Sequence, residues 1–243
     1  MSALDRVSTA VKSGIKSRLT FIGSMVSVQT DRNEFALTFD DGPGPGGTDL
    51  LLPVLDKHGA RATFFVLLTA ARRHPALLQE IVAAGHEVAL HGVDHRALTS
   101  VPHSDVVVRQ QEGKAELEQL VGAPVRFMRP PYGSQSLRTW RATRAAGLTP
   151  ALWGPTTWDW RDIPQTERIE HCLASLEPGA ILLAHDRFAD GTDGVDDGPG
   201  PVVDRVALID SVLAGARERS LVARSLGDLL AVGRPVLSAV FSR

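Results

Sequence analysis

Seven apolar segments of strand length recur along the chain, and each is followed by a segment with the apolar spacing of a helix. Strands are predicted at 35–40, 62–67, 87–90, 125–128, 148–153, 180–184 and 221–223. Helices are predicted at 48–59, 75–85, 104–121, 137–146, 165–176, 202–216 and 226–232. Because parallel strands need a crossover between them, this alternation favours a parallel sheet with helices outside. No Pro- and Gly-rich linker interrupts it, so residues 33–232 are predicted to form one α/β domain.

The chemically reactive side chains follow the ends of the predicted strands. They come after five of the seven strands: Asp40 and Asp41, His91, Arg129, a Trp-rich segment at 153–160, and His185. In a parallel barrel the carboxyl ends of all strands meet at one mouth, whereas an open sheet gathers only the strands beside its switch point. The sequence therefore predicts a seven-stranded parallel (β/α) barrel.

The composition is that of an ordinary globular protein. Of the 243 residues, 43% are hydrophobic and 22% are charged, and the formal net charge is -2. A chain this close to neutrality lacks the basic surface that nucleic acid requires, so no nucleic-acid partner is expected. The single cysteine, Cys172, cannot form an internal disulfide, which favours a reducing compartment.

The segments that flank the domain are predicted as extensions. In 1–32, apolar residues recur at helical spacing with basic residues between them, which predicts an amphipathic helix followed by a strand. This segment has no apolar run as long as a signal peptide or membrane span requires, so a cytoplasmic protein is expected. The basic side of the helix leaves peripheral contact with a membrane surface as an alternative. Residues 233–243 are predicted as a C-terminal tail, and the oligomeric state is left open.

Two adjacent carboxylates, Asp40 and Asp41, stand where the first strand ends. Gly and Pro fill 42–47, and such a run continues neither a helix nor a sheet. Burying two like charges side by side is costly unless one of them is neutralised. A metal ion would neutralise the pair, although Asp-Gly in isolation is typical of a solvated turn.

His91 and His95 are four residues apart, so on a helical turn they share a face and can bind one ion. Two imidazoles and one carboxylate leave positions open for water, as in catalytic sites for Zn²⁺, Fe²⁺, Co²⁺ or Mn²⁺. The other carboxylate would then be free as a base. His86 lies five residues before His91, which places it off that face, and it is assigned a structural role.

Five short motifs stand in order along the chain. They are Thr38-Phe39-Asp40-Asp41-Gly42-Pro43, His91-x-x-x-His95, Arg129-Pro130-Pro131-Tyr132-Gly133, Asp159-Trp160 and Leu183-Ala184-His185. Together they resemble the polysaccharide deacetylases, which share the NodB homology domain and form carbohydrate esterase family 4. The resemblance extends over residues 33–232 and implies a distorted seven-stranded α/β barrel, in agreement with the strand count.

The resemblance also implies a role for the charged motif residues. Asp41, His91 and His95 would hold one divalent transition metal. Zinc is the first expectation, and cobalt, iron, nickel and manganese are the alternatives. Asp40 would be the general base, and His185 would be the general acid.

The remaining motif residues would support these groups or contact a carbohydrate substrate. Arg129 would fix and tune Asp40 as part of the catalytic set. The backbone N–H of Tyr132 would help to stabilise the oxyanion. The substrate-binding set implied by the resemblance is Tyr132, Asp159, Trp160 and Leu183.

The implied reaction removes an N-acetyl group from an amino sugar in a glycan or glycan intermediate. Water on the metal would attack the amide carbonyl, and an acid would protonate the departing amine. Two alternatives remain open within enzymes, namely removal of a formyl group or of an ester-linked acetyl group. A non-catalytic carbohydrate-binding barrel is the alternative outside enzymes.

Two residues depart from the family pattern. Gly92 occupies a position where the family usually has Ser or Thr, and Thr156 stands where the family has an aspartate that pairs with the motif arginine. Both changes remove a support of the site and motivate the non-catalytic alternative. The acidic segment 186–200 is predicted as a mobile flap over the barrel mouth, because its spacing matches no EF-hand calcium loop.

Overall fold

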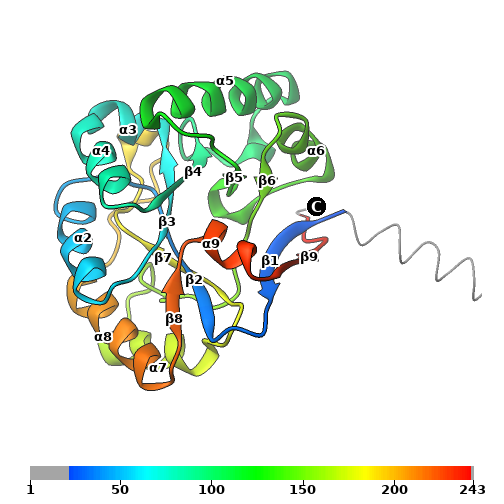
Figure 1. Ribbon diagram of the computed structural model, residues 1–243. Helices are drawn as coiled ribbons and strands as arrows, with labels where there is room; N and C mark the ends of the chain where they lie inside the picture. Colours follow the sequence, from blue (N-terminus) through cyan, green and yellow to red (C-terminus); the bar gives the residue numbers. More distant parts are fainter. Residues whose placement is uncertain (1–21, 242–243) are drawn as a thin grey trace, which may run out of the picture.

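A parallel sheet lies at the centre of the molecule, and helices cover its outer side (Figure 1). The computed structural model describes residues 22–241, so the helix predicted near the N-terminus lies outside the described residues. The sheet has seven strands in the order β6-β5-β4-β3-β2-β7, with β8 paired to β2. Their bounds are β2 Glu34–Asp40, β3 Thr63–Leu67, β4 Glu87–Gly92, β5 Phe127–Met128, β6 Thr149–Pro150, β7 Ile181–His185 and β8 Val222–Arg224.

The sheet curls into a half-barrel, which confirms the predicted distorted α/β barrel. Its two end strands, β6 and β7, do not pair with each other, and irregular backbone at 154–157 runs beside β7 instead. There the Gly154 N–H donates to Ile181 O at 3.0 Å, and the Leu183 N–H donates to Pro155 O at 3.0 Å. Pro155 has no amide hydrogen to donate, which explains why this segment is not a regular strand.

A helix follows each strand of the sheet, as predicted. The seven predicted helices are α2 Thr48–Lys57, α4 Pro75–Ala83, α5 His103–Val121, α6 Leu137–Ala145, α7 Gln165–Ser175, α8 Arg205–Glu218 and α9 Leu226–Ala231. An additional helix, α3 (Leu68–Arg73), continues directly from β3 and was not expected. Its start carries no capping residue, and its apolar residues extend the buried run of β3, so the sequence pattern does not separate the two elements.

The side chains of β2 alternate between two cores. Leu37 and Phe39 are fully buried in the larger cluster, which also contains residues of the outer helices. Ala36 belongs to the smaller cluster inside the barrel. Because side chains alternate along a strand, Thr38 and Asp40 share the interior side with Ala36. The predicted alternation therefore holds, and it directs Asp40 into the barrel.

An antiparallel ribbon of β1 (Ser24–Gln29) and β9 (Arg234–Ser238) lies at one side of the barrel (Figure 1). The predicted C-terminal tail thus contains a strand that folds back onto β1. Isolated bridges join β1 to both sides of the gap in the sheet, from Met25 to Ala151 and from Ser27 to Ala180. The ribbon therefore supports the barrel where β6 and β7 fail to pair.

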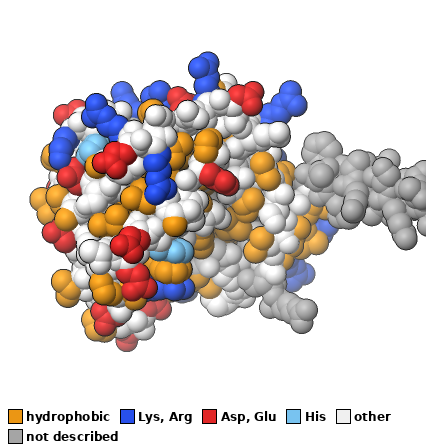
Figure 2. Space-filling model, turned by 90° about the horizontal axis from the view of Figure 1, so that it is seen from below, with side chains coloured by type: hydrophobic (Ala, Val, Ile, Leu, Met, Phe, Trp, Pro, Cys, Tyr) orange, Lys and Arg blue, Asp and Glu red, His pale blue; other side chains and the backbone are white. Residues whose placement is uncertain are grey.

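The surface shows no large region of one charge on the face drawn in Figure 2. Acidic and basic side chains are interspersed there with hydrophobic ones. Within residues 22–241, no helix combines the length and the apolar character needed to cross a membrane. The predicted location of the protein and its predicted contact with a membrane surface stay predictions.

Replacing Phe39 with Ala should destabilise the fold strongly. The Phe39 side chain is fully buried, and its ring stacks on Phe64 at a centroid distance of 5.0 Å. Truncating a buried phenylalanine costs about 3–5 kcal/mol of unfolding free energy. Urea denaturation should show this loss, whereas Val202→Ala, at a residue that is 99% exposed, should cost less than about 0.5 kcal/mol. Similar losses in the two variants would contradict the core described above.

Candidate active site

The loop after β2 places Asp40 and Asp41 at the mouth of the barrel. Asp41 has a φ of 77°, a left-handed conformation that aspartate adopts more readily than most residues. The buried carboxylate of Asp186 fixes this loop, because it accepts the Gly42 N–H at 2.9 Å and the Thr48 hydroxyl at 2.5 Å. A Cβ at Gly42 would lie 1.9 Å from Asp186 Oδ2, so glycine is required there. Burial raises the pKa of Asp186 to about 6.

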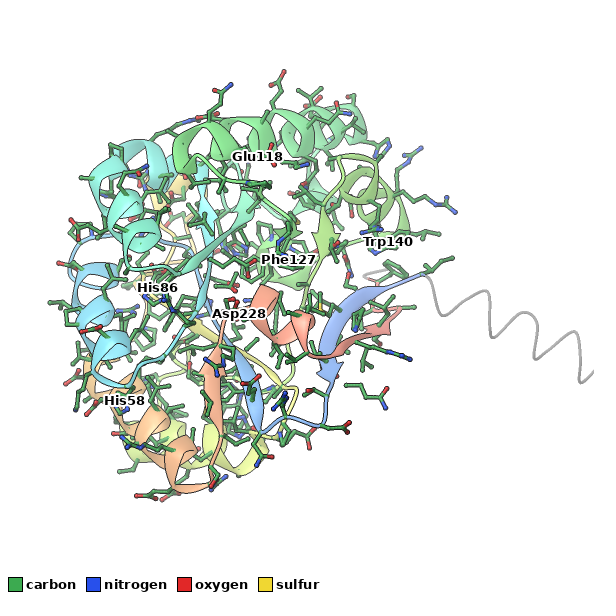
Figure 3. The ribbon with its side chains drawn as sticks, in the orientation of Figure 1. His58, His86, Glu118, Phe127, Trp140 and Asp228 are labelled. Atoms are coloured by element: carbon green, nitrogen blue, oxygen red, sulfur yellow. The ribbon has the colours of Figure 1, made fainter. Side chains whose placement is uncertain are left out.

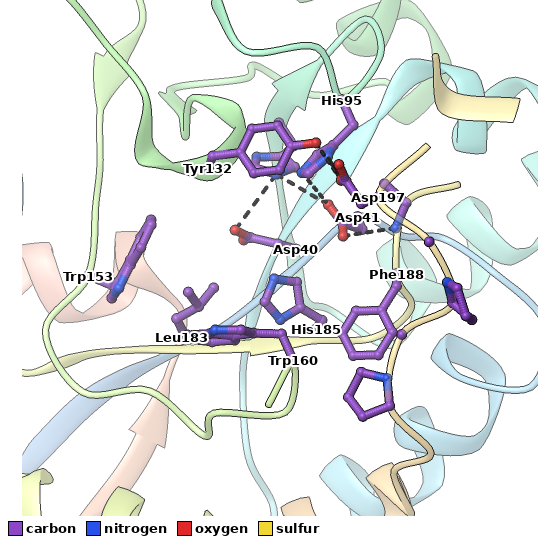
Figure 4. A pocket seen from close by; sticks show the side chains of 16 residues that line it. Asp40, Asp41, His95, Tyr132, Trp153, Trp160, Leu183, His185, Phe188 and Asp197 are labelled. Atoms are coloured by element: carbon purple, nitrogen blue, oxygen red, sulfur yellow. Dashed lines mark hydrogen bonds and ion pairs between the residues drawn. The ribbon is translucent and has the colours of Figure 1, made fainter. Parts of the chain in front are cut away.

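Asp41, His91 and His95 form a buried group that could hold one metal ion. Figure 4 shows Asp41 and His95 at the cavity. Asp41 Oδ1 lies 3.3 Å from Nε2 of His91 and 3.3 Å from Nε2 of His95. This oxygen is buried and has no hydrogen-bond partner. Among residues 22–241, no other set of three His, Cys, Asp or Glu side chains brings its ligand atoms within 4.8 Å of one another. A carboxylate oxygen that faces two imidazole nitrogens suits a divalent cation.

The surroundings of Asp41 favour its ionised form. Burial alone would raise its pKa, but the neighbouring His91 ring and the positive charges of His185 and His95 hold the pKa below its ordinary value. The other oxygen, Oδ2, accepts the backbone N–H of Ala189 at 3.1 Å. A deprotonated carboxylate is the form in which aspartate binds metals, and Oδ1 of Asp41 has no competing hydrogen bond.

The backbone carbonyl of Arg129 sets the orientation of the His91 ring. His91 comes at the end of β4, and its Nδ1 lies 2.8 Å from Arg129 O. A carbonyl only accepts hydrogen bonds, so Nδ1 carries a proton and Nε2 is the ring nitrogen left on the side of Asp41. The His95 ring lies 5.3 Å from the His91 ring, centroid to centroid.

The guanidinium of Arg129 is fully buried inside the barrel and holds Asp40. Its Nη1 donates to Asp40 Oδ1 at 2.6 Å and to Thr38 Oγ1 at 2.9 Å, and its Nη2 donates to Leu152 O at 3.1 Å. The Phe65 ring lies beneath it at 4.0 Å. Burial lowers the pKa of Arg129, and the nearby Asp40 charge opposes this effect. Oδ1 of Asp40 is thus occupied, while Oδ2 faces His91 Nε2 at 3.8 Å.

His185, at the end of β7, is paired with Asp159. Its Nδ1 lies 2.8 Å from Asp159 Oδ1, and its backbone N–H donates to Asp159 Oδ2 at 2.7 Å. Burial would lower the pKa of His185, but the charge of Asp159 and this hydrogen bond outweigh burial and raise it to about 9. Asp159, which the resemblance assigns to substrate binding, is buried, and both of its oxygens are used by His185. The structure therefore indicates a positioning role for Asp159.

A cavity of about 470 Å³ opens above these groups. Its polar side is formed by side chains from the strand ends, as the convergence of strand ends predicts. These are Asp40, Asp41, His91, His95 and His185. Its apolar side includes the predicted substrate residues Tyr132, Trp160 and Leu183, together with two further aromatic residues, Trp153 and Phe188 (Figure 4).

The acidic segment 186–200 covers one side of this cavity. Residues from Phe188 to Ala189 and from Asp197 to Pro201 line the cavity. Asp193 is buried, and it pairs with Arg73 at 2.8 Å and with Arg187 at 2.5 Å. Its carboxylate is therefore already neutralised by arginine, which argues against a calcium loop. Asp197 was not among the predicted site residues, because nothing in its local spacing relates it to residues 100 positions away.

The two departures from the family pattern have local consequences. Gly92 has a φ of 150°, and a Cβ there would lie 2.8 Å from Asp94 O, so the loop leaves no room for the usual Ser or Thr. Thr156 pairs through its backbone with Leu183, and its hydroxyl is buried without a hydrogen-bond partner. Arg129 consequently has Asp40 as its only carboxylate partner among the described residues.

Two other histidines lie outside the site (Figure 3). His86 is buried, its ring packs on Phe64, and its Nδ1 lies 3.3 Å from the Ala62 amide nitrogen. Burial lowers the pKa of His86 to about 4, and the charge of Arg61 contributes a smaller part of this decrease. His58 lies 2.7 Å from Asp210 on α8. Neither ring belongs to the metal-binding group.

The structure thus defines a half-barrel of parallel strands with a buried Asp-His-His group at its mouth. The profile of the polysaccharide deacetylases matches residues 27–151. The chitooligosaccharide deacetylase of Sinorhizobium fredii is 38% identical over 151 residues, which cover 62% of this chain and 70% of the relative. The chain therefore belongs to the polysaccharide deacetylase family.

Solved structures share the fold. A peptidoglycan N-acetylglucosamine deacetylase, crystallised with a substituted N-oxidanyl-benzamide, superposes with a TM-score of 0.73 at 25% identity, covering 84% of this chain and 91% of that chain. A family pseudoenzyme from Bacillus anthracis superposes with a TM-score of 0.73 at 20% identity, covering 84% of this chain and 68% of that chain. At this identity the pseudoenzyme shows a shared fold alone.

Replacing Asp159 with Asn should lower the pKa of His185. The asparagine keeps the size of the side chain and removes the charge that favours the imidazolium. In the wild type, His185 should titrate near pH 9 in the metal-free protein, and in Asp159→Asn it should lose its proton at a lower pH. NMR titration of the His185 ring measures both values. An unchanged midpoint would contradict the assigned role of Asp159.

Proposed function

We propose that the protein is a metal-dependent hydrolase that removes the N-acetyl group from an amino sugar in a glycan. Membership of the polysaccharide deacetylase family supports a carbohydrate deacetylase. The observation that carries the finer proposal is the buried group of Asp41, His91 and His95 beneath a cavity that also contains Asp40 and His185. These residues supply a metal site, a base and an acid within one cavity.

The residues present fit a divalent transition metal. Asp41 Oδ1 is buried without a hydrogen-bond partner, and it faces two imidazole nitrogens. Zinc suits a set of two His and one Asp best, and cobalt, iron, nickel and manganese are alternatives. When bound, the ion would polarise the acetyl carbonyl and lower the pKa of water.

Asp40 is the proposed general base. Arg129 occupies its Oδ1, which leaves Oδ2 free on the side of the metal ligands. From there Oδ2 can take a proton from the attacking water. Arg129 keeps the Asp40 carboxylate in position through Oδ1. The guanidinium of Arg129 is itself held by hydrogen bonds to Thr38 and to the backbone carbonyl of Leu152.

His185 is the proposed general acid. Its raised pKa of about 9 keeps the ring protonated at neutral pH in the metal-free protein. Asp159 occupies Nδ1, so Nε2 is the atom that would donate a proton to the departing amine. An amine is a poor leaving group unless it is protonated, so this step needs an acid at this place.

The aromatic side of the cavity is the proposed sugar-binding surface. Tyr132 is 50% exposed and Trp160 is 40% exposed, so flat apolar faces are available to a sugar ring. Leu183 and Trp160 would contact the acetyl group, and the backbone N–H of Tyr132 would donate to the developing oxyanion.

An N-acetylated chitooligosaccharide is the first substrate to test, because a relative acts on this class of glycan. The zinc-loaded protein should release acetate from it. Asp40→Asn should retain the metal and lower kcat by about 10²–10⁴-fold, since it removes the proton acceptor. Asp31→Asn, at an exposed residue that does not line the cavity, should match the wild type.

Three other outcomes would change the proposal. Release of formate instead of acetate from the matching N-formyl substrate would indicate a deformylase. Cleavage of ester-linked acetyl groups alone would indicate an O-acetyl esterase. Binding of the glycan by the metal-loaded protein without any acyl release would overturn the enzymatic proposal and favour a carbohydrate-binding barrel.

A further inference from the structure

The two metal-ligand histidines differ in how their second ring nitrogen is satisfied. His91 Nδ1 donates to Arg129 O at 2.8 Å, which fixes its ring. His95 Nδ1 is buried and has no hydrogen-bond partner. A histidine that binds metal through one nitrogen usually donates from the other to a carboxylate or carbonyl, which fixes the tautomer and orients the ring. His95 lacks this partner in the structure.

The nearest carboxylate to that nitrogen belongs to Asp197. Its Oδ2 lies 3.9 Å from His95 Nδ1, just outside hydrogen-bond range. The Tyr132 hydroxyl donates to the same oxygen at 2.5 Å, and the Tyr132 ring packs on the His95 ring at 4.3 Å (Figure 4). Within the described residues, Asp197 forms no ion pair with lysine or arginine. Its charge is therefore free to interact with His95.

The segment that carries Asp197 already contacts the metal ligands through its backbone. Asp193 O accepts the His95 N–H at 2.9 Å. The Ala189 N–H donates to Asp41 Oδ2 at 3.1 Å. Residues 187–193 are thus anchored to the site, and Asp197 follows only four residues later. Gly194, between them, has a φ of 79°, so the chain turns back toward the cavity there.

We propose that Asp197 is a positioning residue for His95. A shift of about 1 Å would bring its carboxylate from 3.9 Å to the ordinary range of about 2.9 Å, where it accepts the Nδ1–H of His95. Nε2 of His95 would then be the nitrogen left to hold the metal, as Nε2 of His91 would be. Tyr132 holds the carboxylate on the correct side of the ring. This inference rests on the proposed metal site, and it gives the acidic segment a role in completing that site.

The test measures metal affinity, with the neighbouring aspartate as the control. Metal-free wild type, Asp197→Ala, Asp197→Asn and Asp196→Ala are titrated with Zn²⁺ against a chromophoric chelator. Asp197→Ala should bind Zn²⁺ about 10–100-fold more weakly than the wild type. Asp197→Asn should lose less, because its amide oxygen still accepts a hydrogen bond. Asp196→Ala removes the same charge from an exposed neighbour and should leave affinity unchanged.

A second readout separates positioning from a general structural effect. Co²⁺ reports its ligand geometry through its visible absorption, so Asp197→Ala should change the Co²⁺ spectrum while thermal unfolding of the metal-free protein stays unchanged. Equal Zn²⁺ affinity and equal Co²⁺ spectra in Asp197→Ala and Asp196→Ala would overturn the role of Asp197 and leave the proposed function intact. Absence of metal binding by the wild type itself would overturn both.

Discussion

The buried guanidinium of Arg129 joins the fold of the barrel to the chemistry of its mouth. Its side chain donates to Thr38 and Asp40 on β2 and to the carbonyl of Leu152, while its own carbonyl accepts the His91 ring proton. One residue therefore fixes both the proposed base and the orientation of a proposed metal ligand. Removing one partner of a buried ion pair costs about 3–5 kcal/mol, because the other charge is left unpaired. Arg129 and Asp40 thus depend on each other for stability as well as for position.

The features that follow from local patterns were predicted from the sequence. The apolar periodicity locates all seven strands of the sheet, and the convergence of their ends brings Asp41 together with His91 and His95. The gap between β6 and β7 could not be predicted, because Pro155 and the short β6 interrupt the apolar pattern of a strand. The β1–β9 ribbon could not be predicted either, because its two strands lie at opposite ends of the chain. The pairing of Asp159 with His185 could not be predicted either, because the two residues lie 26 positions apart and no local pattern relates them.

The environments of the aspartates in the acidic segment 186–200 cannot be predicted from its composition. Its composition predicts a mobile acidic flap at the barrel mouth, but three of its aspartates have different environments. Asp186 is buried beneath the loop that carries Asp40 and Asp41, Asp193 is neutralised by two arginines, and Asp197 faces His95. Only the tertiary structure separates these environments, since each depends on a partner more than 60 residues away in the sequence. The segment closes the cavity on one side, and its backbone forms hydrogen bonds with Asp41 and His95.

The most direct test of the account is the metal content of the purified protein. Elemental analysis should find about one transition-metal ion per chain in the wild type and none in His91→Ala purified in parallel, because the variant lacks one of three protein ligands. His74→Ala, which changes a histidine outside the site, should retain the full content. Wild-type protein that remains free of metal after reconstitution with zinc, or His91→Ala that binds as much metal as the wild type, would contradict the assignment of Asp41, His91 and His95.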